Sequence, residues 1–502
     1  MKLGLKIISA LSICLMSTTT ALAANETVVP QIPSKSINEP VKTANSEELP
    51  QNGSTKQIVT LPARNINETT TNAQIGNTTA INKVEQSEKN TVQNLKSVIL
   101  NWHDIPGAVM YELVVKDADS QKMVFTKYDI YASGYQLNNN QVDLTKNLIW
   151  QVRGLNINKA PISDFTDLKV VHIGKNFGAN WQTKGDNYQN EVFSKHTYET
   201  YMIGSDVKVA PLRLTTHFDE MAYMPVYPVY SWIPVTGANY YNIDVFFIGD
   251  NFNNMQKIAS YKVNKGFDYY DTKAYTKVGL YCFNVQAYNI DGAKLAESVN
   301  SYFTVNNKDV KIAALGDSIT HGGGAVSTPP SSTLYDWETY VGYPVLNIGF
   351  SGNLTSDMLN RFNQDVLPFK PKVLFIMGGV NDIRTGISAD TVIGNLNAIK
   401  LKCLDNNIVP VFLTVTPVNP AKMKAVIDLD VSDGWQEQRQ KINEWVTKQP
   451  YHIDIASALT NKQGLLADDL TTDGLHPDYQ GKKSIGEAVG DFIRLNFSYL
   501  FY

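Results

Sequence analysis

Short apolar runs alternate with stretches of helical periodicity between residues 308 and 497. The runs VKIAAL, YPVLNIGF, PKVLFIMG and IVPVFLTV contain few polar side chains, which is typical of strands buried on both faces of a parallel sheet. Helical periodicity follows Ser388, a candidate N-cap before the apolar positions Val392 and Cys403, and it recurs in residues 435–446. The pattern predicts an α/β domain, a three-layer sandwich with a central parallel sheet.

An alternation of apolar and polar positions, typical of half-buried strands, precedes this domain and occurs twice. Trp102 and Trp232 each begin the pattern W-x4-G-A-x-x-Y. A second match, WQVRGLNIN against FNVQAYNID, begins at Trp150 and Phe283. Because the residue types and their spacing agree in both matches, we expect a repeated β-unit.

Each β-unit combines a Trp on an early strand, a glycine-containing turn and an alternating late strand. In these features the two units resemble fibronectin type III modules. The resemblance covers residues 95–175 and 205–306, whereas the stretch from Lys175 to Val209 fits neither unit well. It implies two all-β sandwich domains before the α/β domain.

The first 94 residues have a different composition. Residues 1–23 combine a basic tip, an apolar stretch and Ala21-Leu22-Ala23, which is typical of a secretory signal peptide. Their apolar core is shorter than the roughly 20 residues that span a bilayer, which disfavours a retained membrane anchor. Residues 24–94 are rich in Thr and Asn and contain no aromatic residue, so we expect a disordered linker. These features predict an extracytoplasmic protein, either secreted or associated with the cell envelope.

Charge and cysteine content limit the partners that we expect. The formal net charge is −4, with 44 basic and 48 acidic residues, so nothing favours nucleic acid or an anionic membrane as a partner. Two cysteines follow the signal peptide, Cys282 and Cys403, and they lie in different predicted domains. We therefore expect no structural disulfide, and the sequence leaves the oligomeric state open.

Polar residues follow several of the apolar runs. In an open parallel sheet, ligands bind at the carboxyl ends of the strands, so residues at these points are candidates for a site. The candidates are Gly316-Asp317-Ser318, Gly352, Gly379-Val380-Asn381-Asp382 and, before the last helix, Asp473-Gly474-Leu475-His476-Pro477. Together these groups predict a site for acyl transfer.

Three of these side chains predict a nucleophile and its base. A serine hydroxyl is a weak nucleophile at neutral pH and needs a base, for which His476 is the candidate beside Ser318. Asp473, three residues before His476, can bond the other imidazole nitrogen and fix its tautomer. The backbone N–H groups of Ser318 and Gly352 and the amide of Asn381 are candidate donors of an oxyanion hole. No metal-ligand motif such as H-E-x-x-H occurs, and we expect neither a metal nor a cofactor.

In their order and spacing, GDS, the later glycine, G-x-N-D and D-x-x-H resemble the four sequence blocks of the SGNH (GDSL-type) hydrolase family. The resemblance covers residues 308–497. It implies a serine esterase in which Ser318, Gly352, Asn381 and His476 are catalytic and Asp473 orients the histidine. The nucleophile lacks a G-x-S-x-G elbow, so the α/β-hydrolase fold is a poorer match.

Each candidate also has a purely structural interpretation. Ser318 can be the N-cap of the helix after the first strand, and Asn381 and Asp382 can close a polar turn. Asp317 can serve mainly to brace its loop.

Other residues compete for the base and the acid. His321 lies one helical turn after Ser318 and is a rival base, although no acid is near it in the sequence. Asp468, Asp469 and Asp478 are alternative acids that fit the turn less well.

The substrate is less defined than the site, because one fold and one triad serve many esters. Export, a linker and two β-units are what we expect of an enzyme on an extracellular polymer. They favour O-deacetylation of polysaccharide or peptidoglycan. The alternatives are a lipid esterase of the lysophospholipase or thioesterase kind, and an adhesin with an inactive esterase domain. In the latter case Tyr227 and Tyr230 can form a contact surface, although a place in the core is the stronger interpretation.

Overall fold

The computed structural model describes residues 95–171, 199–204, 207–216, 218, 221–249, 255–324 and 333–502. The predicted signal peptide and linker lie outside these ranges. All described residues belong to one compact unit of the chain. Within these ranges, no helix has the length and hydrophobicity to cross a membrane.

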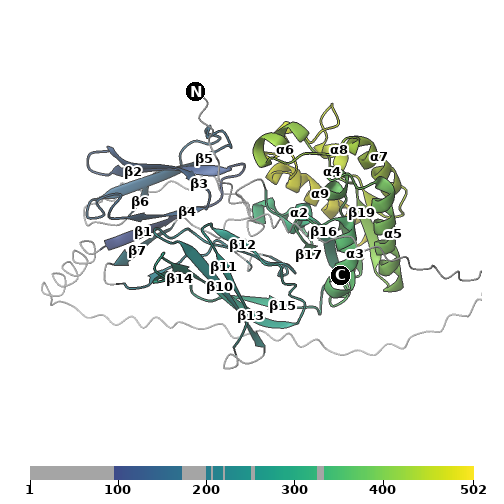
Figure 1. Cartoon of the computed structure of the whole chain (residues 1–502), viewed down its shortest axis with the longest axis horizontal. Coiled ribbons are helices and arrows are strands. Elements are labelled where there is room, and N and C mark those ends of the chain that lie inside the picture. Colours follow the sequence, from purple (N-terminus) through teal and green to yellow (C-terminus); the bar gives the residue numbers. More distant parts are fainter. Residues whose placement is uncertain are drawn as a thin grey trace, which may run out of the picture. The chain divides into compact units, whose positions relative to one another are not determined.

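Sheets that are antiparallel except for the pairing of β8 with β14 form the first part of the described chain (Figure 1). Two sheets, with the orders β4-β1-β7 and β3-β2-β5-β6, contain the first β-unit. Their strands are β1 (Leu95–Asn101), β2 (Met110–Asp117), β3 (Met123–Ile130), β4 (Gly134–Asn138), β5 (Leu148–Leu155), β6 (Lys169–Val170) and β7 (Glu199–Gly204). Strand β7 lies beyond residue 175, so the first sheet takes in residues that the sequence pattern left outside both units.

The second β-unit has one larger sheet, with the order β11-β10-β13-β14-β8, and β15 also pairs with β13. A separate ribbon joins β12 and β9. The strands are β8 (Ala210–Pro211), β9 (Val229–Ser231), β10 (Tyr240–Gly249), β11 (Gln256–Val263), β12 (Asp268–Tyr270), β13 (Gly279–Tyr288), β14 (Lys294–Glu297) and β15 (Ser301–Val305).

The repeated sequence pattern makes the same contacts in both β-units. The buried rings of Trp102 and Tyr111 lie 5.5 Å apart, and those of Trp232 and Tyr241 lie 4.9 Å apart. In each copy the Tyr hydroxyl accepts a hydrogen bond from the backbone N–H three residues after the Trp, at 3.4 Å in the first unit and 2.9 Å in the second. The two units therefore share these contacts as well as the sequence pattern.

The C-terminal domain alternates strands and helices, as its pattern predicts. Its strands are β16 (Ile312–Gly316), β17 (Leu346–Gly349), β18 (Val373–Met377), β19 (Val409–Leu413) and β20 (His452–Ile453). Its α-helices are α2 (Ser318–His321), α3 (Thr355–Asp365), α4 (Val380–Arg384), α5 (Ala389–Asp405), α6 (Pro420–Ile427), α7 (Trp435–Val446), α8 (Ala456–Leu459) and α9 (Tyr479–Asn496). The 3-10 helices are η3 (Thr333–Tyr335), η4 (Trp337–Tyr340), η5 (Asp468–Leu470) and η6 (Ser498–Phe501).

The strands of this domain form one parallel sheet with the order β17-β16-β18-β19-β20. The four predicted strands are confirmed. Strand β20 was not predicted, because two residues are too few to produce an apolar run. Helix α5 begins after Ser388, whose side chain accepts a hydrogen bond from the Thr391 N–H, so the predicted N-cap is also confirmed.

Helices cover both faces of the parallel sheet. Phe412 of β19 pairs with Ile376 of β18, so the two side chains share a face, and the Phe412 ring lies 5.1 Å from Trp445 of α7. Phe375 precedes Ile376 and points to the opposite face, where its ring lies 6.4 Å from Phe492 of α9. Helices α7 and α9 therefore lie on opposite faces, which is the predicted three-layer arrangement.

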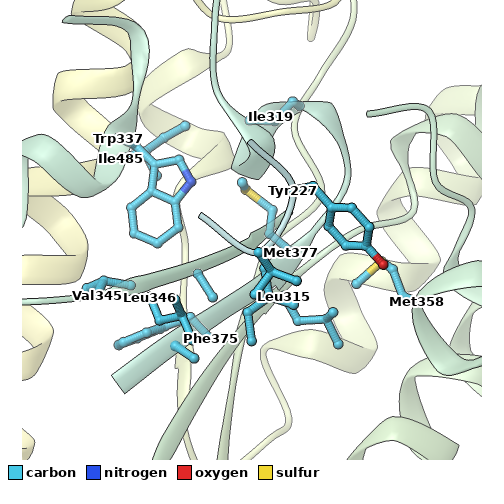
Figure 2. Packing of buried hydrophobic residues seen from close by; sticks show 14 of the residues in the cluster. Tyr227, Leu315, Ile319, Trp337, Val345, Leu346, Met358, Phe375, Met377 and Ile485 are labelled. Atoms are coloured by element: carbon cyan, nitrogen blue, oxygen red, sulfur yellow. The ribbon is translucent and has the colours of Figure 1, made fainter. Parts of the chain in front are cut away.

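The core of this domain is part of a larger buried cluster that also includes residues of the second β-unit, and Figure 2 shows Tyr227 of that unit with Leu315 and Met358. Helix α9 packs closely on η4, because a Cβ at Gly486 would lie only 2.2 Å from the Trp337 carbonyl oxygen. Gly486 lies about two turns into α9, which begins three residues after His476. Cys403 is buried in the same core and Cys282 in the second β-unit, and neither forms a disulfide, as predicted.

Candidate functional site

The strand order makes the carboxyl end of β16 the expected position of a ligand site. The chain passes from β16 to β17 on one side and then to β18 on the other, so the direction of winding reverses at β16. Ligands bind at the carboxyl ends of the strands beside such a switch point. Asp317 and Ser318 follow β16 at this point, and Ser318 is the first residue of α2.

A continuous hydrogen-bond chain joins Ser318, His476 and Asp473. The Ser318 Oγ lies 2.9 Å from the His476 Nε2, and the His476 Nδ1 lies 2.7 Å from an Asp473 carboxylate oxygen. Ser318 and His476 are half-buried, and the Asp473 side chain is buried. The structure thus brings together three residues that are separated by up to 158 positions in the sequence.

Local hydrogen bonds shape the turn that carries the acid and the base. The second Asp473 oxygen accepts the backbone N–H groups of Leu475 and His476, each at 2.8 Å. The Thr471 hydroxyl donates to the His476 carbonyl oxygen at 2.8 Å. Burial alone would raise the pKa of Asp473, but the charge and hydrogen bonds of His476 outweigh it and hold that pKa below its usual range. Asp473 therefore stays ionised beside the imidazole.

Residues 350–353 form a tight turn after β17, which we call the oxyanion turn because it contains Gly352, one of the donors that the sequence predicts for an oxyanion hole. The Asn353 N–H donates to the Phe350 carbonyl oxygen at 3.2 Å, and Gly352 has a φ of +83°, which suits the third position of a type II turn. A Cβ at Gly352 would meet no atom within 4 Å, so open space lies beside this backbone. The turn bond does not use the Gly352 N–H.

Asn381 lies in α4, directly after β18, and its side chain is buried. Its amide nitrogen donates to the Asn353 carbonyl oxygen at 3.1 Å. A side-chain amide has two N–H donors, so one remains for another acceptor. The adjacent Asp382 accepts the Thr355 N–H at 3.0 Å and the Thr355 hydroxyl at 2.6 Å, so its side chain joins α4 to α3 and does not close the turn considered for it.

A buried ammonium ties α9 to α2. Lys482 is fully buried, and its Nζ donates to the Ile319 carbonyl oxygen at 2.7 Å. Burial lowers its pKa, while the nearby carboxylates of Asp336, Glu338 and Asp317 oppose that change.

Burial also raises the pKa of Asp317 to about 6. Asp317 is the N-cap of α2 and accepts the Ile319 N–H at 2.9 Å, so it braces the loop, and Ser318 is not the cap.

The rival base and acids have other partners. The His321 Nε2 lies 2.7 Å from the Tyr227 carbonyl oxygen, and its Nδ1 faces Ser351. Asp468 is exposed and pairs with Lys422. Asp478 accepts the Thr472 hydroxyl at 2.9 Å.

The sequence did not identify two residues that lie next to the site, Arg361 and Tyr227. Arg361 of α3 donates to the Asn353 side chain at 2.6 Å, to the Gly316 carbonyl oxygen at 2.9 Å and to Asp365 at 3.0 Å. It thereby links the end of β16 to the oxyanion turn. Tyr227, which the sequence placed in a core or a contact surface, is buried, and its hydroxyl donates to Asp365 at 2.7 Å. Neither residue belongs to a motif that would have signalled this position.

Within the described residues, no group of His, Cys, Asp and Glu side chains is arranged to hold a metal ion. The chemistry that the site offers is that of a hydroxyl, an imidazole and a carboxylate in sequence, next to backbone and amide donors.

Comparison with known families places the C-terminal domain. Residues 314–483 match the GDSL-like Lipase/Acylhydrolase family. The match covers about a third of the chain and confirms the family resemblance for this domain. No curated protein matches the chain.

Solved structures that resemble the chain each cover a similar share of it. A lipase/acylhydrolase from Enterococcus faecalis is 24% identical, covers 37% of this chain and 95% of its own, and has a TM-score of 0.31. A lipolytic protein of the G-D-S-L family from Desulfitobacterium hafniense is 23% identical, covers 36% of this chain and 99% of its own, and has a TM-score of 0.31. An acetyl-xylooligosaccharide esterase from Geobacillus is 21% identical, covers 38% and 95%, and has a TM-score of 0.28.

Proposed function

We propose that the GDSL-like domain at the C-terminus is a serine esterase, with Ser318 as the nucleophile, His476 as the base and Asp473 as the orienting acid. The observation that supports this proposal most directly is the hydrogen-bond chain from Ser318 through His476 to Asp473. Both hydrogen bonds fall within the range of about 2.6–3.2 Å that proton transfer between a nucleophile and its base requires.

In the first step, Ser318 Oγ attacks the ester carbonyl carbon while the His476 Nε2 takes its proton. The imidazolium that forms is stabilised by the ionised Asp473, which also keeps the neutral ring in the tautomer that leaves Nε2 free to accept. The same nitrogen then returns the proton to the leaving alcohol, and an acyl-enzyme remains. In the second step His476 deprotonates a water, which hydrolyses the acyl-enzyme and restores the Ser318 hydroxyl.

The negative oxygen that develops in both steps needs donors that already point toward it. We assign these donors to the Ser318 N–H at the start of α2, the Gly352 N–H of the oxyanion turn and the second N–H of the Asn381 amide. The open space beside Gly352 and the contact between Asn381 and Asn353 support this assignment. Each such donor typically contributes about 100- to 1000-fold to the rate.

For the substrate we propose the O-acetyl groups of an extracellular polysaccharide or peptidoglycan. The predicted signal peptide, the predicted linker and the two β-units, which we propose to be fibronectin type III-like modules, support an enzyme that is exported and works on a polymer.

The test compares p-nitrophenyl acetate with longer-chain p-nitrophenyl esters as substrates of the purified chain, with the Ser318→Ala variant as the control. We expect hydrolysis that favours acetate and that falls to the background rate in Ser318→Ala. Acetate release from acetylated xylan and from O-acetylated peptidoglycan then separates the two polymers.

Other outcomes lead to different conclusions. A preference for long chains together with good lysophospholipid turnover would replace the deacetylase with a lipid esterase. Equal activity of the wild-type chain and Ser318→Ala, or no activity in either, would contradict the serine esterase itself.

A further inference from the structure

We propose that His321 is a positioning residue that holds the oxyanion turn in its active geometry, and that the Tyr227 carbonyl of the second β-unit fixes the ring for this task. The inference rests on the proposed esterase function and adds a dependence of catalysis on a segment outside the GDSL-like domain. It starts from the contacts of the two imidazole nitrogens.

The partners of His321 define its tautomer. The Nε2 lies 2.7 Å from the Tyr227 carbonyl oxygen, which can only accept, so Nε2 must carry a hydrogen. In the neutral ring, Nδ1 is then an acceptor. It faces two donors of Ser351, the backbone N–H at 3.2 Å and the hydroxyl at 2.9 Å. Only this tautomer satisfies every contact of the ring.

The surroundings of His321 keep the ring neutral. The side chain is 3% exposed, and burial lowers the pKa of His321 to about 4, with the charges of Arg361 and Lys482 acting in the same direction and the Tyr227 carbonyl opposing them. Tyr270 of β12 also contacts the ring, with the centroids 5.8 Å apart. The acceptor at Nδ1 is therefore present throughout the neutral pH range.

The contact at Nδ1 acts on the oxyanion turn itself. Ser351 directly precedes Gly352. Because the His321 Nδ1 accepts from the N–H and the hydroxyl of Ser351, it fixes the peptide units that orient the Gly352 N–H. The Phe350 ring, at the start of the turn, is stacked on the imidazole with an angle of 9° between the planes and 6.3 Å between the centroids. Gly349 allows this proximity, because a Cβ there would lie 2.2 Å from the His321 backbone nitrogen.

The Tyr227 segment is anchored to the GDSL-like domain at three points, so its carbonyl is a fixed acceptor. The Val226 N–H donates to the Asn347 carbonyl oxygen of β17 at 3.0 Å. The Tyr227 hydroxyl donates to the buried Asp365 at 2.7 Å, and its ring lies 4.6 Å from Phe350. Figure 2 draws Tyr227 within the same buried cluster as Leu315 of β16 and Met358 of α3.

Amide side chains can separate the two functions of the ring. His321→Asn keeps an acceptor near the position of Nδ1, His321→Gln keeps a donor near that of Nε2, and His321→Ala keeps neither. We expect kcat for p-nitrophenyl acetate to fall about 10- to 100-fold in His321→Ala and His321→Gln, because a misplaced oxyanion donor loses part of its contribution. His321→Asn should recover at least fivefold over His321→Ala, and KM should change less than twofold in all three variants.

The matched control is His452→Gln. His452 is half-buried in the same domain, and its ring also contacts a backbone carbonyl, that of Gln449 at 2.8 Å, but it lies on β20. It should keep the wild-type kcat. Thermal unfolding of every variant shows whether a loss of kcat comes from a loss of fold, and only a loss of kcat in a folded variant supports the inference.

A measurement without substrate reads the tautomer directly. In the full chain labelled with ¹⁵N-histidine, the signals assigned to His321 by their loss in His321→Gln should show a hydrogen on Nε2 and no titration between pH 5.5 and 8. A hydrogen on Nδ1, titration near pH 6.5, or wild-type kcat in His321→Ala would overturn the inference and leave the esterase untouched. Absence of any hydrolysis that depends on Ser318 would instead overturn the proposed function, and the inference with it.

Discussion

The turn that carries His476 and the oxyanion turn differ in where most of their hydrogen bonds come from. Most hydrogen bonds of residues 471–476 come from within the turn: Asp473 accepts two of its backbone N–H groups, and Thr471 closes it. Asn419 and Lys422 add one contact each from outside, to the Gly474 and Thr471 carbonyl oxygens. The oxyanion turn depends on distant residues. His321, Asn381 and Arg361 contact it from three different helices, and Tyr227 holds His321 from the second β-unit.

This difference predicts how each turn responds to substitution. A locally closed turn keeps its shape when one distant contact is lost, so changes there act through chemistry. A turn that is held from outside loses its geometry when its supports are removed, so residues that never touch the substrate can affect the rate. The predictions below test that distinction, beginning with the largest expected effect.

Asp473→Asn should produce the largest loss on the acid–base side apart from loss of the serine. An amide retains the shape but favours the wrong imidazole tautomer, and the equivalent change in a serine protease triad lowers kcat by about 10⁴-fold. We expect a loss of kcat of that order with little change in melting temperature, measured with p-nitrophenyl acetate and by thermal unfolding.

Asp468→Asn is the matched control for that variant, because Asp468 was a rival acid and lies exposed on η5 beside Lys422. It should keep wild-type activity. A loss in Asp468→Asn that equals the loss in Asp473→Asn would contradict the assignment of the acid.

The local turn was also the part of the site that the sequence predicted best. The spacing of Asp473 and His476 in D-x-x-H already implies a carboxylate within reach of the imidazole, because three residues in one turn leave few alternatives. Ser318, Gly352 and Asn381 were located by their position after apolar runs, since parallel strands bring their carboxyl ends to one edge. The α/β pattern was readable because each of these strands is buried on both faces.

The supports of the oxyanion turn were not predictable in this way. Tyr227 and His321 are separated by 94 positions and belong to different sequence patterns, and their contact is between a ring and a backbone carbonyl. No residue type marks a carbonyl acceptor. Arg361 was missed for a related reason, because its i,i+4 partner Asp365 makes it look like an ordinary helical ion pair. Burial of that pair is visible only in the folded chain.

Asn381→Ala should have the second largest effect and tests the oxyanion side through a proposed donor. Removing one donor typically costs about 100- to 1000-fold in kcat, and the loss should be smaller than that of Asp473→Asn. Because the Asn381 amide also donates to the Asn353 carbonyl, the variant removes a support of the turn together with the donor. The rate is measured with p-nitrophenyl acetate under saturating substrate.

Asn363→Ala is the control for that change. Asn363 is exposed on α3, and its side chain accepts from Lys402 at 3.0 Å, so wild-type kcat is expected. If Asn381→Ala changed KM and left kcat at the wild-type value, Asn381 would bind the ground state, and its place in the oxyanion hole would be wrong.

The smallest effect should come from Tyr227→Phe, which removes the hydroxyl and keeps the carbonyl that His321 requires. Hydrogen bonds to charged groups contribute about 1.5–3 kcal/mol to stability, and Arg361 still pairs with Asp365 after the change, so we expect a loss near the lower end of that range. Since the segment is less firmly anchored, kcat should fall by about two- to fivefold, less than in His321→Gln.

Tyr241→Phe separates stability from positioning. Its hydroxyl accepts the Val235 N–H at 2.9 Å within the repeated motif of the second β-unit, so its loss should lower the free energy of unfolding by about 1–2 kcal/mol and leave kcat unchanged. Both free energies follow from urea unfolding of the full chain, and both rates from p-nitrophenyl acetate hydrolysis. Equal kcat in the two variants would mean that the Tyr227 segment only stabilises the fold. His321 would then be the outermost residue that supports the geometry of the oxyanion turn.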